Sequence, residues 1–328
     1  MKKVNILVVG SFVMDLIVTT PRFPVAGETI LGSDFNMASG GKGANQAVQA
    51  ARLGANVTMV GCVGNDVNGK TMLECLKNDG IDVSHVVLHD TLPSAVGNVQ
   101  IEAAADGSTQ NRIIVVPGAN FGLRAEHVSF LKEEISNYDF VIMQLEIPME
   151  INMLVARYAH DAGVPVMLNP APAAKIPAEL LSNVNYISPN ETELALLCGV
   201  EPFSDNDEEK IDSAKKYAEL LRQDFGVENV LVTLGSSGAL MLNNQGITRS
   251  LAVKCDPKDP TAAGDSYVGA LCYALSIGLS TESAMNFAAA TASITVSKMG
   301  AQPSLPFRSD VVELLESLGN HYLVKQVR

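Results

Sequence analysis

The sequence has no cluster of lysine and arginine. Its 328 residues carry 23 Lys and Arg against 36 Asp and Glu, which gives a formal net charge of −13 at neutral pH. A protein of this charge repels nucleic-acid phosphates, so we expect no nucleic-acid partner. A small anionic substrate such as ATP stays possible, because backbone amides and one or two fixed cations can hold phosphates inside an acidic protein.

Cysteines and long hydrophobic runs are also scarce. The five cysteines are odd in number and widely spaced, and none forms a C-x-x-C pair. This pattern is typical of reduced thiols in a cytoplasmic protein. The longest apolar stretch, residues 267–279, contains Gly269 and Gly278 and is too short to span a bilayer. We therefore expect no membrane segment.

Low-complexity tracts and long linkers are absent as well. Hydrophobic residues make up 47% of the chain and charged residues 18%, which is typical of a folded globular protein. The five histidines have no metal-ligand spacing. We expect one main domain over residues 1–328.

Short β-branched runs alternate with longer helical patterns along the chain. Strands are predicted at residues 5–9, 57–63, 140–144, 164–168, 186–188 and 230–233. Helices are predicted at residues 45–53, 70–79, 151–162, 191–197, 210–222 and 263–279. This alternation predicts a doubly wound α/β fold, in which helices cover both faces of a mostly parallel sheet.

Two segments break the alternation, at about residues 13–39 and 95–117. Both are strand-like without a helix between the strands, and Asp106-Gly107 between two extended runs favours a hairpin. We expect these two insertions to form a small β-sheet at the edge of the main domain. Such a sheet would act as a lid.

The sharpest local feature is the sequence Ala262-Ala263-Gly264-Asp265 at the start of a predicted helix. If the helix begins near Ala262, the free N–H groups of these residues form an anion site, and the helix dipole strengthens it. Asp265 would then hold a carboxylate where a substrate hydroxyl could lose its proton. A simple helix cap with close glycine packing is the alternative interpretation.

At this point the sequence resembles a known family. Residues 262–269 read A-A-G-D-S-Y-V-G and residues 40–47 read G-G-K-G-A-N-Q-A, which are similar to the two signatures of the ribokinase/phosphofructokinase-B family of sugar kinases. Shorter matches follow in the family's order, so the resemblance runs from about residue 6 to 306. They lie at residues 10–15, 144–146, 168–172, 189–193, 233–236 and 300–304.

The resemblance implies an ATP-dependent kinase that phosphorylates the primary hydroxyl of a pentose, with D-ribose as the first candidate and ribose 5-phosphate as product. Asp265 would be the base, and the amides of Ala262, Ala263 and Gly264 would hold the transferring phosphoryl group. The residues implied to bind the sugar are Asp15, Gly41, Lys42, Asn45, Glu146 and Asp265.

The resemblance also assigns the nucleotide and its ions, and it implies a homodimer that could form through the exposed lid sheet. Glu193 would help to place Mg²⁺ through water. Residues on the nucleotide side would be Asn190, Thr233, Gly235, Ser236, Gly238 and Gly264. A potassium ion would be held by the side chains of Asp259 and Ser304 and by the carbonyls of Thr261, Thr295, Lys298 and Gly300. It would order the loop that carries the anion site, which Pro260 could reshape.

One departure concerns the sugar. Val13 stands where ribose-phosphorylating members carry a sugar-binding asparagine, and valine cannot make that hydrogen bond. Members that phosphorylate deoxyribose also have an apolar residue there. This keeps 2-deoxy-D-ribose or another small sugar as an alternative substrate.

Two further interpretations stay open. The chain could be a sugar-binding regulator that has lost catalysis. Residues 64–71 also fit the P-loop pattern G-x-x-x-x-G-K-[ST], although Asp66 would place a negative charge where a phosphate should lie.

Overall fold

The computed structural model describes residues 3–103, 109–204 and 206–328, and a nine-stranded sheet forms its centre. The order is β13-β12-β11-β10-β9-β8-β1-β4-β5; all neighbours from β11 to β5 are parallel, and β12 and β13 join antiparallel. The strands are β1 (Asn5–Val9), β4 (Asn56–Gly64), β5 (Val86–His89), β8 (Phe140–Gln144), β9 (Val166–Asn169), β10 (Tyr186–Ile187), β11 (Asn229–Thr233), β12 (Ala239–Asn243) and β13 (Gly246–Ser250).

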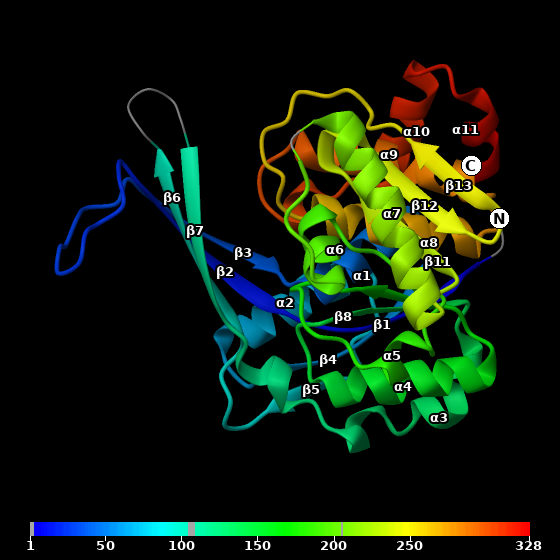
Figure 1. The fold of residues 1–328 in the computed structure, drawn as a ribbon. Helices are drawn as coiled ribbons and strands as arrows, with labels where there is room; N and C mark the ends of the chain where they lie inside the picture. The colour runs from blue at the N-terminus through cyan, green and yellow to red at the C-terminus, as the bar shows by residue number, and fades with distance from the viewer. Residues whose placement is uncertain (1–2, 104–108, 205) are drawn as a thin grey trace.

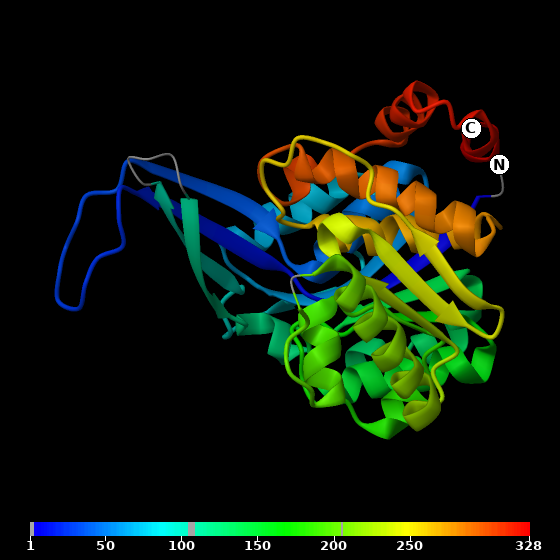
Figure 2. The same cartoon turned by 45° about the horizontal axis from the view of Figure 1, so that its top comes forward.

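Helices cover both faces of this sheet (Figures 1 and 2). One face packs against α1 (Lys42–Leu53), α2 (Val67–Asn78), α8 (Ala263–Ser276), α9 (Thr281–Val296), α10 (Arg308–Ser317) and α11 (His321–Val327). The other packs against α3 (Leu131–Glu134), α4 (Met149–Ala162), α5 (Ala178–Leu181), α6 (Glu191–Cys198) and α7 (Asp207–Phe225). The predicted doubly wound fold is confirmed.

The sequence of β1 explains why both faces are covered. Ile6 and Val8 belong to one buried cluster, whereas Leu7 and Val9 belong to the other. Side chains alternate between the two faces of a strand, so an unbroken apolar run must be buried on both sides. Two hydrophobic cores therefore lie on opposite sides of one sheet.

A second sheet of four strands projects from this body as the lid (Figures 1 and 2). Its order is β3-β2-β6-β7; β2 and β6 are parallel, and the outer pairs are antiparallel. The strands come from the two predicted insertions. They are β2 (Val13–Thr20), β3 (Asp34–Gly40), β6 (Val96–Ala103) and β7 (Thr109–Val116). The turn expected at Asp106-Gly107 lies outside the described residues.

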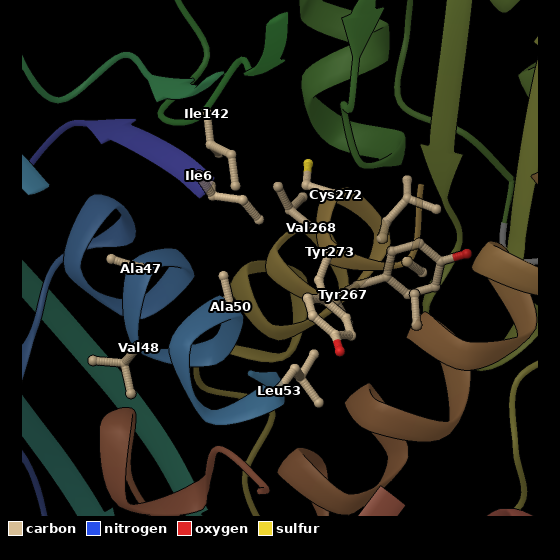
Figure 3. Close-up of a cluster of buried hydrophobic side chains, with 14 of the residues drawn as sticks. Ile6, Ala47, Val48, Ala50, Leu53, Ile142, Tyr267, Val268, Cys272 and Tyr273 are labelled. Carbon is tan, nitrogen blue, oxygen red and sulfur yellow. The ribbon is translucent and has the colours of Figure 1, made fainter. Parts of the chain in front are cut away.

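Helices α1 and α8 lie against each other beneath the site (Figure 3). Their contact is close because Gly269 has no side chain: a Cβ there would lie 2.8 Å from the carbonyl oxygen of Gln46. Ala47 and Ala50 add small side chains from α1. This packing brings the N-terminal ends of the two helices together.

Several boundaries differ from the prediction. The predicted helix 263–279 ends at Ser276, and α1 begins at Lys42 rather than at residue 45. Strands β5, β12 and β13 and helices α9 to α11 were not predicted. Helix α9 is buried over most of its length and lacks the one-sided apolar pattern that reveals a surface helix. Among the described residues, no helix is long and apolar enough to cross a membrane.

Candidate active site

A cavity of about 200 Å³ opens at the carboxyl ends of β9, β10 and β11, where open α/β sheets bind ligands. The start of α8 closes one side of it and Lys42 of α1 another. The residues that line it are Lys42, Asn169, Ala171, Ser188, Asn190, Glu193, Thr233, Pro260, Ala262, Ala263, Gly264, Asp265 and Val268. The fold thus joins predicted residues from four distant segments.

The N-terminus of α8 faces this cavity. Ala262 caps the helix in the left-handed conformation, with φ at 60°, a strained backbone for a residue other than glycine. Ala263 donates its N–H to the carbonyl of Pro260 at 3.2 Å. The N–H groups of Gly264 and Asp265 lie in the first turn, where a helix offers no internal acceptor. The turn at Pro260 therefore occupies one of the amides that the sequence assigned to the phosphoryl group.

Asp265 is 7% exposed, and two side-chain amides of α1 orient its carboxylate. Asn45 Nδ2 donates to Oδ2, and Gln46 Nε2 donates to Oδ1, both at 2.9 Å. The Oδ1 atom of Asn45 is buried and has no hydrogen-bond partner in the described structure. A free acceptor beside a carboxylate suits a hydroxyl-rich ligand.

Glu146 lies at the N-terminus of α1. Its Oε2 accepts the N–H of Lys42 at 3.1 Å and the hydroxyl proton of Ser11. A carboxylate at this end of a helix is stabilised by the helix dipole. Gly41 precedes the helix with φ at 94°, and a Cβ there would lie 2.7 Å from the backbone nitrogen of Val13. The glycine is needed because these two backbone segments touch.

Asp15 reaches the same region from the lid. It pairs with Ala38 on β3 and with Gly97 on β6. A Cβ at Gly97 would lie 2.2 Å from Asp15 Oδ1, so the absent side chain makes room for the carboxylate. Burial, and then the negative charge of Glu146, raise the pKa of Asp15 to about 6. Of the six residues implied to bind the sugar, Lys42 and Asp265 line the cavity. The others adjoin these two: Glu146 accepts the N–H of Lys42, Asp15 feels the charge of Glu146, and Asn45 donates to Asp265.

Lys42 is the only lysine or arginine among the described residues that line the cavity. Burial alone would lower its pKa, but the negative charges of Asp265, Glu146 and Glu193 outweigh that effect and raise the pKa. The ammonium group therefore stays charged at neutral pH. A charged ammonium group among three carboxylates can donate hydrogen bonds to the hydroxyls of a ligand.

Asn190 and Glu193 form a reciprocal cap at the start of α6. Asn190 Oδ1 accepts the N–H of Glu193 at 2.8 Å, and Glu193 Oε2 accepts the N–H of Asn190 at 2.9 Å. Burial raises the pKa of Glu193. The cap uses only one carboxylate oxygen, so Oε1 and the amide nitrogen of Asn190 are left for a ligand.

The predicted nucleotide loop is only partly in the cavity. Of its four residues, Thr233 lines the cavity, whereas Gly235 and Ser236 lie in the short 3₁₀ turn after β11. Gly238 has φ at 89°, and a Cβ there would lie 2.1 Å from the carbonyl oxygen of Ser250. The backbone at the end of β13 therefore requires a glycine at 238, and this packing explains the glycine without a role in nucleotide binding.

The P-loop-like segment lies elsewhere. Asp66 caps α2 by accepting the N–H of Gly69 at 2.8 Å, and it also accepts the N–H and hydroxyl of Ser94. Burial would raise the pKa of Asp66, but these hydrogen bonds outweigh it and lower the pKa. The negative charge of Asp66 would thus repel a phosphate at this turn. Lys70, the lysine of the P-loop pattern, is exposed.

The chain resembles known proteins along nearly its whole length. Residues 3–308 match the family described as pfkB family carbohydrate kinase. This chain belongs to the pfkB family of carbohydrate kinases.

Several ribokinases share this similarity. The chain is 40% identical to a ribokinase of Haemophilus influenzae over 313 residues, which cover 95% of this chain and 98% of that protein. It is 37% identical to a ribokinase of Bacillus subtilis over 311 residues, 95% of this chain and 99% of the relative. A solved structure of Arabidopsis thaliana ribokinase in complex with ribose and ATP superposes with a TM-score of 0.84 at 34% identity, covering 96% and 99% of the two chains.

In this pfkB-family kinase, the two loops assigned to potassium lie side by side. Asp259 Oδ1 accepts the N–H and hydroxyl of Thr261, and Oδ2 accepts the N–H of Gly300 at 2.8 Å. Burial would raise the pKa of Asp259, but these hydrogen bonds outweigh it and lower the pKa. The carbonyl of Thr295 accepts the N–H of Lys298, and the hydroxyl of Ser304 donates to Ala301. The loops supply carboxylate and carbonyl oxygens, which suit potassium.

Sequence analysis gave no role to three residues of this site. Gln46 contacts Asp265, Asn169 lines the cavity, and Ser188 follows β10 at its edge. Gln46 and Asn169 both lie within quoted family matches, so the signal was present. The sequence did not show which buried amides face the Asp265 carboxylate. Among the described residues, no group of three or more His, Cys, Asp or Glu could hold a metal ion.

Proposed function

We propose that this protein is an ATP-dependent ribokinase that transfers the γ-phosphoryl group of ATP to the primary hydroxyl of D-ribose. The observation that carries this proposal is the Asp265 carboxylate. It is held by Asn45 and Gln46 beside the open N-terminus of α8, within one cavity with Lys42. A base beside an anion site is what transfer of a phosphoryl group to an alcohol needs.

The position of each residue suggests its role in the reaction. Asp15, Lys42, Asn45 and Glu146 hold the sugar hydroxyls, so the primary hydroxyl points at Asp265. Asp265 accepts the proton of that hydroxyl as the hydroxyl oxygen attacks the γ-phosphorus. The bond from the γ-phosphorus to the bridging oxygen breaks, and ADP leaves. The amides of Gly264 and Asp265 stabilise the charge on the transferring group. Closure of the lid excludes water and so suppresses hydrolysis of ATP.

Two ions fit the residues that are present. The uncapped oxygen of Glu193 and the free amide of Asn190 would hold Mg²⁺ through water, and the ion would neutralise charge on the triphosphate. Potassium would bind at the loops that Asp259 joins and would order the turn that leads to Ala262.

A second candidate substrate is 2-deoxy-D-ribose. Val13 is 5% exposed and has no polar side-chain atom to pair with a sugar hydroxyl. An unpaired hydroxyl in a closed pocket costs about 1–3 kcal/mol, so a sugar that lacks it gains relative to ribose. Comparing the two sugars at saturating ATP decides between them.

We further infer a cytoplasmic homodimer that forms through the lid. All five cysteines are free thiols, which fits a reducing compartment. Among the described residues, the lid strands carry several exposed apolar side chains. They include Phe35, Met37, Ile113, Ile114, Val115 and Val116.

The decisive experiment measures ADP release with Mg-ATP and potassium in the presence of D-ribose, 2-deoxy-D-ribose, other pentoses, fructose or nucleosides. Asp265→Asn should lower kcat by about 10²–10⁴-fold, because the base is lost while its shape is kept. Turnover of that variant within a few-fold of wild type would overturn the assignment. A wild-type protein that binds a sugar but releases no ADP would instead be a sugar-binding regulator.

A further inference from the structure

Behind Asp265 lies a chain of buried side-chain amides, of which only Gln46 touches the carboxylate. Its members come from three separate elements: Gln46 on α1, Gln144 at the end of β8 and Asn169 at the end of β9. Gln46 and Gln144 are fully buried, and Asn169 is 9% exposed. Polar groups at this depth are costly unless each one is paired. The presence of three such side chains beside the proposed base therefore suggests that they have a function.

The hydrogen bonds run in one direction. Asn169 Nδ2 donates to the backbone carbonyl of Ser188 at 2.9 Å. Gln46 Nε2 donates to Asn169 Oδ1 at 3.2 Å and to Asp265 Oδ1 at 2.9 Å. Gln144 Nε2 donates to Gln46 Oε1 at 2.6 Å. Every link has a donor facing an acceptor.

The backbone fixes this direction. A carbonyl oxygen can only accept, so the Ser188 carbonyl requires the nitrogen of Asn169 to face it and leaves Oδ1 to face Gln46. That oxygen in turn requires the nitrogen of Gln46 to point at Asn169 and Asp265. If Gln46 were rotated, its oxygen would face a carboxylate, and two acceptors would be buried against each other.

Packing gives Gln144 no room to turn away. A Cβ at Gly10 would lie 2.0 Å from Gln144 Oε1, so only a glycine at the end of β1 leaves space for this amide. Asn152 holds the Gln144 backbone by donating to its carbonyl at 2.8 Å. The Asn169 end of the amide chain is thus bonded to the backbone, whereas Gln144 Oε1 is buried without a hydrogen-bond partner in the described structure.

We propose that Gln46 is a positioning residue for phosphoryl transfer, held by Asn169 and Gln144 so that its N–H fixes the direction of the Asp265 carboxylate. This inference rests on the proposed kinase function. Asn45 takes Oδ2 and Gln46 takes Oδ1, so the carboxylate cannot rotate about its Cβ–Cγ bond without losing both donors. The remaining lone pairs then point at the cavity. A base in a fixed direction matters because a displacement of 1 Å can cost about 10²-fold in rate.

The test replaces the amide without changing the length of the side chain. Gln46→Met should lower kcat by about 10- to 100-fold and leave the KM for the sugar within about threefold, because the variant loses direction at the base and no contact with the sugar. The matched control is Gln49→Met, one turn further along α1. Gln49 is equally buried, but it bonds to Pro306 and Ser266 instead of Asp265. It should lose stability and keep kcat within about threefold.

A double-mutant cycle separates positioning from general damage. In the Asp265→Asn background, Gln46→Met should lower kcat no further, because there is no base left to direct. The same loss in both backgrounds, a wild-type kcat in Gln46→Met, or an equal loss in Gln49→Met would each overturn the proposal. If Gln46→Met does not fold, Asn169→Leu tests the same chain and should give the same cycle.

The proposed function is tested separately. The cycle uses whichever sugar gives wild-type turnover, so the choice between ribose and deoxyribose does not affect its outcome. Absence of any sugar-dependent ADP release by wild type would contradict the kinase proposal before Gln46 is tested.

Discussion

Asp15 has a carboxyl group whose ionisation opposes folding. Its pKa is about 6 because burial and Glu146 both disfavour the charged form, against an ordinary value of 3.8 in the unfolded chain. The folded protein therefore binds a proton more readily than the unfolded chain does. Stability contributed by this group is present below pH 4 and is lost as the pH rises through 6.

We expect Asp15→Asn to be more stable than wild type at pH 8, by on the order of 1–2 kcal/mol. The difference should shrink at pH 5, where Asp15 of the folded protein is mostly protonated. The KM for the sugar should rise at least about tenfold, because a carboxylate that accepts two hydroxyls is gone. Thermal unfolding at the two pH values and sugar titrations measure both effects. A variant that is less stable at pH 8 would contradict this account.

Single residues also mark the limit of prediction from sequence. Asp265, Lys42 and Asn45 could be predicted because they lie in dense motifs. Gln46 could not be given a role, since the residues that orient it, Gln144 and Asn169, are about 100 positions away and meet it only through the sheet. A local sequence motif predicts the residues that contact a ligand. It does not predict the residues, distant in the sequence, that orient them.

At the scale of elements, the contact between α1 and α8 places the side chains of α1 beside Asp265, the proposed base. Gly269 lies where the two helices touch, and Gln46 and Gln49 lie opposite it. Asn45 and Gln46 reach Asp265 from the end of α1 that this contact positions. The separation of the two helices therefore sets the distance from Asn45 and Gln46 to Asp265.

Gly269→Ala should separate these helices. Alanine favours a helix by about 0.5–1 kcal/mol over glycine, but overpacking a buried contact costs about 1–3 kcal/mol, so we expect a net loss of stability. The value of kcat should fall with it, as the bonds from Asn45 and Gln46 to Asp265 lengthen. Chemical denaturation and steady-state kinetics measure these changes. Ser276→Ala, in the last turn of α8, is the control, and its kcat should stay at the wild-type value.

Two of the elements that were not predicted have a physical explanation. Strands of the parallel sheet were predicted because they are apolar on both faces. In contrast, β13 is a short edge strand with mostly exposed side chains, and α9 is buried on most sides, so neither has the period that reveals its type. The residues around Asp265 lie outside these elements, whereas Thr295 of the predicted potassium site lies in α9.

At the scale of the whole molecule, the lid is a sheet with exposed apolar side chains. Ile113 and Val115 lie in register with Ile17 and Asp15 across β6, and their side chains are 54% and 49% exposed. Apolar side chains on an open sheet are typical of an interface. A second copy of the chain would cover them.

We therefore expect a particle of twice 34.7 kDa in solution. Ile113→Lys should shift the protein toward the monomer, because burying an unpaired ammonium group at the interface is unfavourable. Size-exclusion chromatography with light scattering measures the mass. Ile247→Lys is the matched control, since Ile247 is 50% exposed on β13 of the main sheet. A wild-type monomer at micromolar concentration would disprove the interface.

The proposed sugar site is divided between two sheets. Asp15 stands on the lid, whereas Asp265 and its amides stand on the body. A sugar held by both is a removable piece of tertiary structure: while it is bound, it joins two parts of the chain. Binding of a sugar should therefore slow hydrogen exchange along β2 and β6, and release of the phosphorylated product should restore it.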